Sequence, residues 1–185
     1  MQFSHKCSIY SIIFNKFCTV NPLLNKEPVK RAEKAIKAFD PELEIICLEQ
    51  TARTAKDAAT ALGCSVGAIV KSLLFSSGNN FVLCLVSGDN RCSLNKLKKV
   101  LDEKDISMAH PNDVKKITGY TIGGVSPVGH LSNVKIYIDT NLERFTTVFA
   151  AAGHPNCVFK INFSQLITLT SGEIKEITEW GNQNY

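Results

Sequence analysis

A lysine inside an apolar run is the first residue that could carry chemistry. Lys71 interrupts the stretch AIVKSLLF, with Ile69 and Val70 before it and a further apolar run after it. A buried ammonium is costly unless its head group reaches a cleft or a partner, whereas an edge or snorkelling lysine keeps its charge in water. The functional interpretation is a fixed positive charge in a pocket, facing a phosphate, a carboxylate or a developing oxyanion. The position alone leaves both interpretations open.

A glycine-rich segment is the second candidate. The stretch GYTIGGVSPVGH, residues 119–130, contains four glycines and one proline. It lacks the GK[ST] ending of a phosphate-binding P-loop and does not open a long helix. Its backbone N–H groups could form an anion-binding nest, but surface turns also collect Gly, Ser and Pro.

Asp139 ends the stretch VKIYID and is the third candidate. A carboxylate at a strand end can position a lysine, an amine or a water, and it can equally form a turn. Together with Ser126 and His130 it could make a Ser/His/Asp triad, although the sequence has no nucleophile-elbow motif.

Metal and disulfide chemistry are disfavoured. The spacing of His110, His130, His154 and Cys157 matches no standard zinc pattern. The seven cysteines are odd in number and form no C-x-x-C pair. We therefore predict no metal, no cofactor and a reducing, cytoplasmic setting.

Several helices that would support these residues can be read from the sequence. Apolar residues at helical spacing predict a helix that begins near Pro28 and stops at Asp40. Thr54 and Asp57 predict a capping box for a thin, alanine-rich helix that ends at Gly63. Shorter helices are expected at LNKLKKVL and PNDVKKIT and near residue 164, with Ser93 and Ser164 as caps of the first and the last.

Strand patterns complete the fold class. AIVKSLLF and FVLCLVS predict a hairpin with the five-residue loop SSGNN. Further strands are expected at EIICL, VKIYID, TTVFAAAG, CVFKIN and EIKEI. In VKIYID, Val134, Ile136 and Ile138 should share one face. These elements predict an α/β fold with a mixed, mainly antiparallel sheet and helices packed around it.

Composition agrees with one soluble globular domain. The chain has 185 residues, 44% hydrophobic and 21% charged, with a net charge of +4. This weak positive charge tolerates a polyanionic partner without requiring one. Residues 1–25 read as a separate N-terminal arm of unknown role, since their apolar run is too short for a membrane span and no cleavage site follows.

Five pieces of the sequence together resemble the YbaK/EbsC family of aminoacyl-tRNA deacylases, which is related to the editing domain of bacterial prolyl-tRNA synthetases. In order they are TARTAKDAATALGCSVGAIVKSLLF, VSG, TGYTIGGVSPVGH, IYID and AAGHPNCVF. The resemblance covers approximately residues 26–179 and implies one YbaK-like editing domain, residues 26–185, around a barrel-like sheet.

The resemblance also implies which residues form the site. Lys71 matches the family's lysine, and its GGxxPxG loop matches Gly123, Gly124, Ser126, Pro127 and Gly129; these six are the predicted catalytic residues. Asp139, Gly153, Thr54 and Ser72 are assigned to substrate binding. His130 departs from the family pattern and receives no role.

The implied activity is editing in trans, the hydrolysis of the ester that joins a wrong amino acid to tRNA. The expected substrate is the 3′ acceptor end of tRNA(Pro) carrying Cys, Ala, Ser or a similar small residue, with prolyl-tRNA synthetase as a partner. Glycine-segment amides and Lys71 would stabilise the oxyanion. For cysteine, the substrate's own thiol could attack the ester carbonyl, so that the ribose oxygen leaves and the amino acid is released as a thiolactone. The alternatives are a non-catalytic module that binds a tRNA end or a nucleotide, and an unrelated serine hydrolase.

Overall fold

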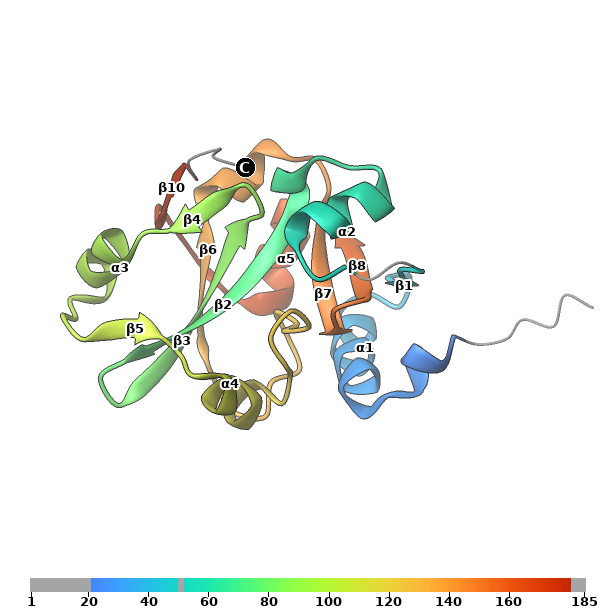
Figure 1. Cartoon of the computed structure of the whole chain (residues 1–185), viewed down its shortest axis with the longest axis horizontal. Helices are drawn as coiled ribbons and strands as arrows, with labels where there is room; N and C mark the ends of the chain where they lie inside the picture. The colour runs from blue at the N-terminus through green and yellow to red at the C-terminus, as the bar shows by residue number, and fades with distance from the viewer. Residues whose placement is uncertain (1–20, 50–51, 181–185) are drawn as a thin grey trace, which may run out of the picture.

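The computed structural model describes residues 21–49 and 52–180 of the chain. Within these residues there are five α-helices and three short 3₁₀ helices (Figure 1). The α-helices are α1 (Glu27–Phe39), α2 (Ala55–Leu62), α3 (Leu94–Leu101), α4 (Pro111–Thr118) and α5 (Phe163–Thr170). The 3₁₀ helices are η1 (Pro22–Asn25), η2 (Val66–Ala68) and η3 (Thr140–Arg144).

The described strands form an eight-stranded mixed sheet and a separate two-stranded ribbon. The strands of the sheet are β1 (Ile45–Cys47), β2 (Ile69–Ser77), β3 (Asn80–Ser87), β5 (Ile106–Met108), β6 (Lys135–Asp139), β7 (Val148–His154), β8 (Cys157–Ile161) and β9 (Glu173–Lys175). Their order is β1-β8-β7-β2-β3-β6-β9, and β5 also pairs with β2. The ribbon joins β4 (Asn90–Cys92) to β10 (Thr178–Trp180).

The predicted fold class is confirmed. Of the seven pairings in the large sheet, four are antiparallel and three, namely β2 with β7, β3 with β6 and β6 with β9, are parallel. Helices cover both faces of this sheet, because α1 and α5 contribute to one apolar cluster whereas α2 and α3 contribute to two others.

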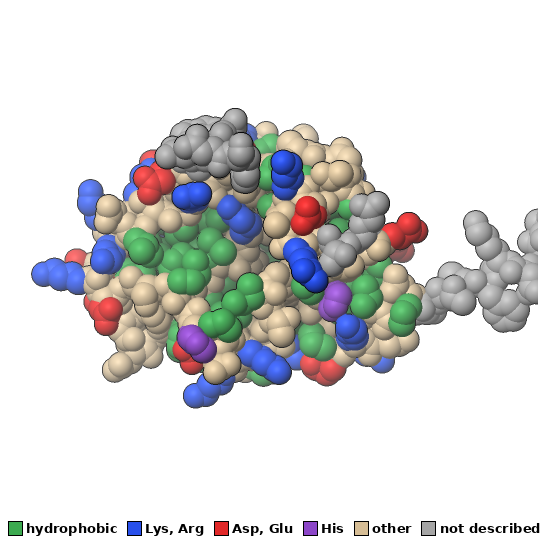
Figure 2. Space-filling view, in the orientation of Figure 1, with side chains coloured by type: hydrophobic (Ala, Val, Ile, Leu, Met, Phe, Trp, Pro, Cys, Tyr) green, Lys and Arg blue, Asp and Glu red, His purple; other side chains and the backbone are tan. Residues whose placement is uncertain are grey.

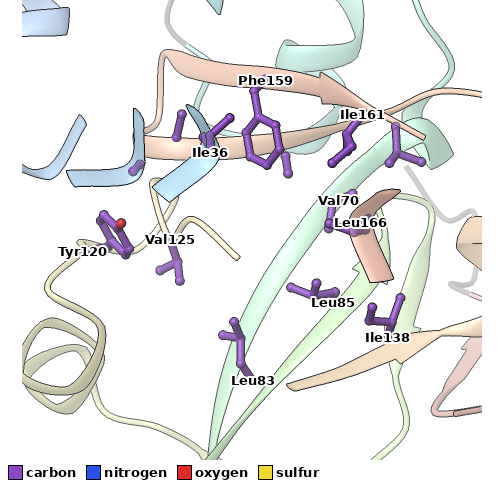
Figure 3. Packing of buried hydrophobic residues seen from close by; sticks show 14 of the residues in the cluster. Ile36, Val70, Leu83, Leu85, Tyr120, Val125, Ile138, Phe159, Ile161 and Leu166 are labelled. Carbon is purple, nitrogen blue, oxygen red and sulfur yellow. The ribbon is translucent and has the colours of Figure 1, made fainter. Parts of the chain in front are cut away.

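Side chains that alternate along the β2–β3 hairpin divide the core into clusters on the two faces of the sheet. Leu83 and Leu85 of β3 join Val70, Ile138 and Leu166 in the main cluster, which Figure 3 shows from close by. Their neighbours on β3, Val82, Cys84 and Val86, point to the opposite face and pack with Leu97 of α3. Val134, Ile136 and Ile138 share the main-cluster side, as the alternation in VKIYID predicts.

The helices α1 and α2 agree with the predictions made from the sequence. In α1, Val29, Ala32 and Ile36 are buried. Thr54 caps α2 through the predicted reciprocal box, since its Oγ1 accepts from Asp57 N at 3.1 Å while Asp57 Oδ2 accepts from Thr54 N at 3.1 Å.

Other details differ from the predictions. The hairpin loop contains two residues, Gly78 and Asn79, because pairing continues to Ser77 and Asn80. Asn162 caps α5 instead of Ser164, through a capping box with Gln165. Ser93 stands at the N-cap of α3 without a side-chain cap hydrogen bond. Three further strands, β4, β5 and β10, have three residues each and are not predicted by the sequence pattern.

Most of the predicted N-terminal arm, residues 1–20, lies outside the described residues. Its last residues form η1, and Leu23 and Leu24 pack against the main apolar cluster. Within residues 21–49 and 52–180, none of the helices has the length and apolar character that crossing a membrane requires.

Candidate functional site

The site begins where the sheet forks beside β2. One edge of β2 pairs with β3 from Val70 to Ser77. On the other edge, β2 pairs with β7 only at Ile69 and Val70, and with β5 only from Phe75 to Ser77. Residues 71–74 therefore lie between two strands that diverge, although Leu74 O accepts a hydrogen bond from Ala109 N at 3.0 Å.

Ser72 presents its polar groups at this fork. In an antiparallel strand, the N–H and C=O of one residue point to the same edge and the direction alternates along the chain. Since Leu74 uses its carbonyl on the forked edge, the N–H and C=O of Ser72 point to that edge as well. The Ser72 hydroxyl is buried and has no hydrogen-bond partner among the described atoms. A ligand in the fork would meet a donor and an acceptor of the backbone.

A cavity of about 440 Å³ occupies the fork. Its size is within the range of small-ligand sites in proteins. Its wall is mainly apolar and is formed by residues of β2, β5, β7, β8, α2 and α4 and of the segments that connect these elements. The lining residues are Ala52, Arg53, Thr54, Ala55, Ala58, Ile69, Val70, Lys71, Ser72, Leu73, Leu74, Met108, Ala109, Val114, Ile122, Gly123, Val125, Phe149, Ala151, Pro155 and Val158.

Figure 2 shows apolar side chains gathered on the face over β2 and Lys and Arg side chains on several sides of them. Two large apolar side chains of the lining, Met108 and Ile122, are 58% and 63% exposed. They are therefore available to an apolar part of a ligand that extends out of the cavity.

Lys71 lines the cavity and is half-buried, as the functional interpretation of its position requires. Its ammonium donates a hydrogen bond to the backbone carbonyl of Asn90 in β4. Burial lowers the pKa of Lys71, and the negative charge of Asp89 opposes this shift. An ammonium has three donors, so the bond to Asn90 leaves others for a ligand.

The glycine segment (residues 119–130) contributes part of one wall. Gly123 and Val125 line the cavity, and Gly123 has a φ of +87°. Gly124 N donates to Thr121 O at 2.9 Å, so this amide is used inside the segment. A Cβ on Gly124 would lie 2.8 to 2.9 Å from backbone atoms of His154. Gly124 therefore permits close packing of the segment on the last residue of β7.

The other residues predicted in this segment lie behind the wall. Ser126 and Pro127 are buried and do not line the cavity. Gly129 O accepts hydrogen bonds from Arg31 Nε at 2.8 Å and from Tyr120 Oη at 3.0 Å. These contacts hold the segment in the fold.

Of the four predicted substrate-binding residues, the structure brings Thr54 and Ser72 to the cavity with Lys71. Asp139 and Gly153 are elsewhere. Asp139 is fully buried and accepts from Asn141 N, Ile177 N and Thr178 Oγ1 at 3.0, 3.0 and 2.9 Å. A Cβ on Gly153 would lie 2.4 Å from Pro28 O, so this glycine lets β7 approach the start of α1.

The contacts of Ser126, His130 and Asp139 do not form a catalytic triad. His130 Nε2 lies 2.8 Å from the backbone oxygen of Ser126, which makes the imidazole a donor to that carbonyl. Burial lowers the pKa of His130. The Ser126 hydroxyl lies near Val128 N at 3.4 Å, and Asp139 has the three other partners described above.

The described residues contain no group of three or more His, Cys, Asp and Glu side chains that could hold a metal ion. One of the histidines considered for such a site, His110, caps α4 by accepting from Asn112 N at 3.3 Å.

Most residues of the cavity wall were not among the site residues predicted from the sequence. Arg53, Met108, Ile122 and Pro155 reach it from loops and strand ends that do not stand out by composition. Arg53 could have been inferred from its place beside Thr54. Met108 and Ile122 could not, because their exposure depends on how β5 and the glycine segment pack.

Comparisons with known proteins identify the family of the chain. Residues 49–169 match the family described as the aminoacyl-tRNA editing domain. The uncharacterized protein YwhH of Bacillus subtilis (strain 168) is 33% identical over 129 residues, which are 69% of this chain and 82% of YwhH. EbsC of Enterococcus faecalis (strain ATCC 700802 / V583), named as a candidate Cys-tRNA(Pro)/Cys-tRNA(Cys) deacylase, is 29% identical over 68% of this chain and 77% of its own length.

Longer relatives and solved structures extend the comparison. A proline–tRNA ligase of Caldicellulosiruptor bescii is 26% identical over 88% of this chain, which spans only 26% of the ligase. A crystal structure described as a candidate trans-editing enzyme for prolyl-tRNA synthetase has a TM-score of 0.79 and 35% identity, and covers 83% of this chain and 98% of its own. The chain therefore belongs to the aminoacyl-tRNA editing domain family, the YbaK/EbsC-type deacylases related to the editing domains of prolyl-tRNA synthetases.

Proposed function

We propose that this protein removes small wrong amino acids from tRNA(Pro) in trans, with the cavity beside β2 as the hydrolytic site. The observation that carries the proposal is the fork of the sheet, where the backbone of Ser72 and the half-buried Lys71 border one cavity. Because the described residues that line the cavity include no nucleophile paired with a general base, we assign water as the attacking group.

The reaction needs a placed water and a stabilised oxyanion. Water attacks the ester carbonyl carbon, the bond from that carbon to the ribose oxygen breaks, and the ribose oxygen takes up a proton. The products are the free amino acid and uncharged tRNA. Preorganised donors that face the developing negative charge lower this barrier. Lys71 and the Ser72 N–H are the donors that we assign to this task.

The apolar wall favours a small side chain. Ala58, Phe149 and Val158 surround the cavity without a charged group of their own. Alanine, serine and cysteine esters fit this description and are the substrates that we propose. One methylene is worth only about 1–3 kcal/mol in such a pocket, so a second site that destroys small wrong products is useful to a synthetase. With a cysteine ester, attack by the substrate's own thiol on its carbonyl carbon would expel the ribose oxygen and give a thiolactone.

The relatives support the choice of tRNA(Pro). One is named as acting on Cys-tRNA(Pro) and Cys-tRNA(Cys), and others are proline–tRNA ligases. The proposed activity in trans would act beside prolyl-tRNA synthetase in the cytoplasm, where mischarged tRNA(Pro) arises. The Lys and Arg side chains around the apolar side chains over β2 in Figure 2 would contact the phosphates of the acceptor end.

A panel of charged tRNAs tests the proposal. Ala-, Ser- and Cys-tRNA(Pro) should lose their amino acid in the presence of the protein, and Pro-tRNA(Pro) should be spared. Mass spectrometry of the cysteine product separates free cysteine from a thiolactone. Binding of the same tRNAs should weaken steeply as salt is raised. Binding without release from any member of the panel would instead establish the non-catalytic tRNA-binding module.

A further inference from the structure

One arginine of α1 contacts both ends of the glycine segment. Arg31 Nη2 donates to Gly119 O at 2.9 Å, and its Nε donates to Gly129 O at 2.8 Å. The two carbonyls are ten positions apart in the chain. A single guanidinium therefore closes the segment into a loop whose ends are held together.

The guanidinium is itself held in place. Its Nη1 lies 2.7 Å from both carboxylate oxygens of Glu27, one helical turn earlier in α1. Its central carbon lies 4.6 Å from the centre of the Tyr120 ring, which is fully buried. Tyr120 Oη donates in turn toward Val128 O and Gly129 O, at 2.8 and 3.0 Å. Charge-assisted bonds of this kind are stronger than bonds between neutral groups.

The loop that Arg31 closes carries part of the cavity wall. Ile122, Gly123 and Val125 lie between its two contact points and line the cavity. This loop contains no described helix or strand, so its shape depends on such side-chain contacts. Arg31 also precedes residues 49–169, which match the editing-domain family.

We propose that Arg31 is a positioning residue that fixes the cavity wall by holding both ends of the glycine segment from α1. The expected effect of Arg31 on deacylation rests on the proposed function, whereas its expected effect on the order of residues 119–130 does not. Arginine suits this role because its planar fork offers separated donors to two carbonyls at once. A lysine is a compact point charge and would reach one of the two.

The experiment compares Arg31→Met and Arg31→Lys with Glu27→Gln as the matched control. Glu27→Gln removes a charge from the same cluster, at a side chain that is 73% exposed, and leaves both loop contacts of Arg31 in place. Hydrogen exchange of residues 119–130 and steady-state deacylation are measured at a temperature at which circular dichroism shows each variant folded. Tyr120→Phe perturbs the same loop in a second way, since it removes the hydrogen bonds of the phenol to Val128 O and Gly129 O.

We expect amide exchange in residues 119–130 to rise by about tenfold in Arg31→Met, with exchange in β2 and β3 unchanged. On the best substrate of the panel, kcat should fall by about tenfold to a hundredfold with little change in KM. Arg31→Lys should recover only part of both effects, and Glu27→Gln should have a much smaller effect than Arg31→Met, because an exposed ion pair contributes little.

Unchanged exchange in residues 119–130 of folded Arg31→Met would overturn the proposal. Parent-like amide exchange and kcat in Arg31→Lys would also overturn the proposal, because a single point charge would then be sufficient to hold the loop. If Arg31→Met does not fold, Arg31→Lys decides by the same exchange measurement, because a lysine can donate to only one of the two loop carbonyls at a time. If the parent protein releases no amino acid, the proposed function fails, while the exchange data still decide whether Arg31 holds the loop.

Discussion

The cavity beside β2 and the polar cluster around Asp139 both place polar groups among buried apolar ones, but they differ in what these groups face. Asp139 has three donors at hydrogen-bonding distance and no lining role in the cavity. Ser72, in contrast, has a hydroxyl without a partner among the described atoms and backbone groups that point into open space.

Asn90 connects the two regions. Its carbonyl accepts from Lys71, and its Nδ2 donates to Thr178 Oγ1 at 3.2 Å, which donates to Asp139. Asn90 Oδ1 is the one atom of this chain of contacts without a partner among the described residues. Asp139 is therefore bonded within the fold and linked to Lys71 through Asn90, whereas Lys71 and Ser72 line the cavity and are the residues that we propose to meet a ligand.

Asp139→Asn should have the largest effect and should act on stability. The amide replaces one acceptor oxygen by a donor, so at least one of the N–H and O–H groups that Asp139 satisfies loses its partner. Bonds to a charged group contribute about 1.5–3 kcal/mol each, and we expect the free energy of unfolding to fall by about 3 kcal/mol. Urea unfolding measures this change, with the exposed Asp105→Asn as control. A fully stable Asp139→Asn protein that has lost deacylation would move Asp139 into the site.

Lys71→Ala should act on activity instead. We expect deacylation to fall by at least about 10²-fold, or roughly 2.7 kcal/mol of transition-state stabilisation, with a nearly unchanged melting temperature. Lys71→Arg should not rescue the rate, because a guanidinium fills the pocket differently from an ammonium. The exposed Lys99→Ala on α3 controls for the loss of one positive charge. Parent-like turnover by Lys71→Ala would end the catalytic assignment.

Met108→Ala and Ile122→Ala should have smaller effects, on substrate binding. Both side chains are exposed at the cavity, and apolar contact with the terminal nucleoside of the tRNA is worth about 1 kcal/mol for each, or about fivefold in KM. We expect kcat to stay unchanged. Leu94→Ala is the control, since Leu94 is 42% exposed on α3 and does not line the cavity. An equal change of KM in all three variants would contradict a specific role of Met108 and Ile122 in substrate binding.

The pH dependence of stability should give the smallest effect. Burial lowers the pKa of His130 from its ordinary value of 6.5, so the unfolded chain takes up a proton at a higher pH than the folded protein. Stability should therefore decline as the pH falls below about 6.5, and His130→Gln should reduce this decline. Melting temperatures at about pH 5 and about pH 7.5 measure it. His154→Gln is the companion variant, because burial and Lys26 lower the pKa of His154 as well. A larger acid-induced loss in His130→Gln than in the parent would contradict this sign.

Part of the site could be predicted from sequence because its signals are local. Lys71 is anomalous within its own strand, and Thr54 is marked by a capping box with Asp57, three positions later. Both line the cavity. The roles of Gly124, Gly129 and Gly153 could not be separated from that of Gly123, since a glycine looks the same whether it approaches a ligand, another turn or a helix. Only the neighbouring atoms, His154 for Gly124 and Pro28 for Gly153, make the distinction.

The sequence by itself determined the elements that depend on near neighbours: α1 with its buried stripe, α2 with both caps, the β2–β3 hairpin and the alternation along β6. Tertiary structure decided where one edge of β2 is left without a strand partner, because β5 and β7 reach that edge from positions about 30 and 80 residues away. It also decided that Arg31 closes the glycine segment and that Asp139 faces Ile177 and Thr178. These outcomes depend on packing between segments distant in the chain, where the burial of apolar surface fixes neighbours that no local pattern specifies.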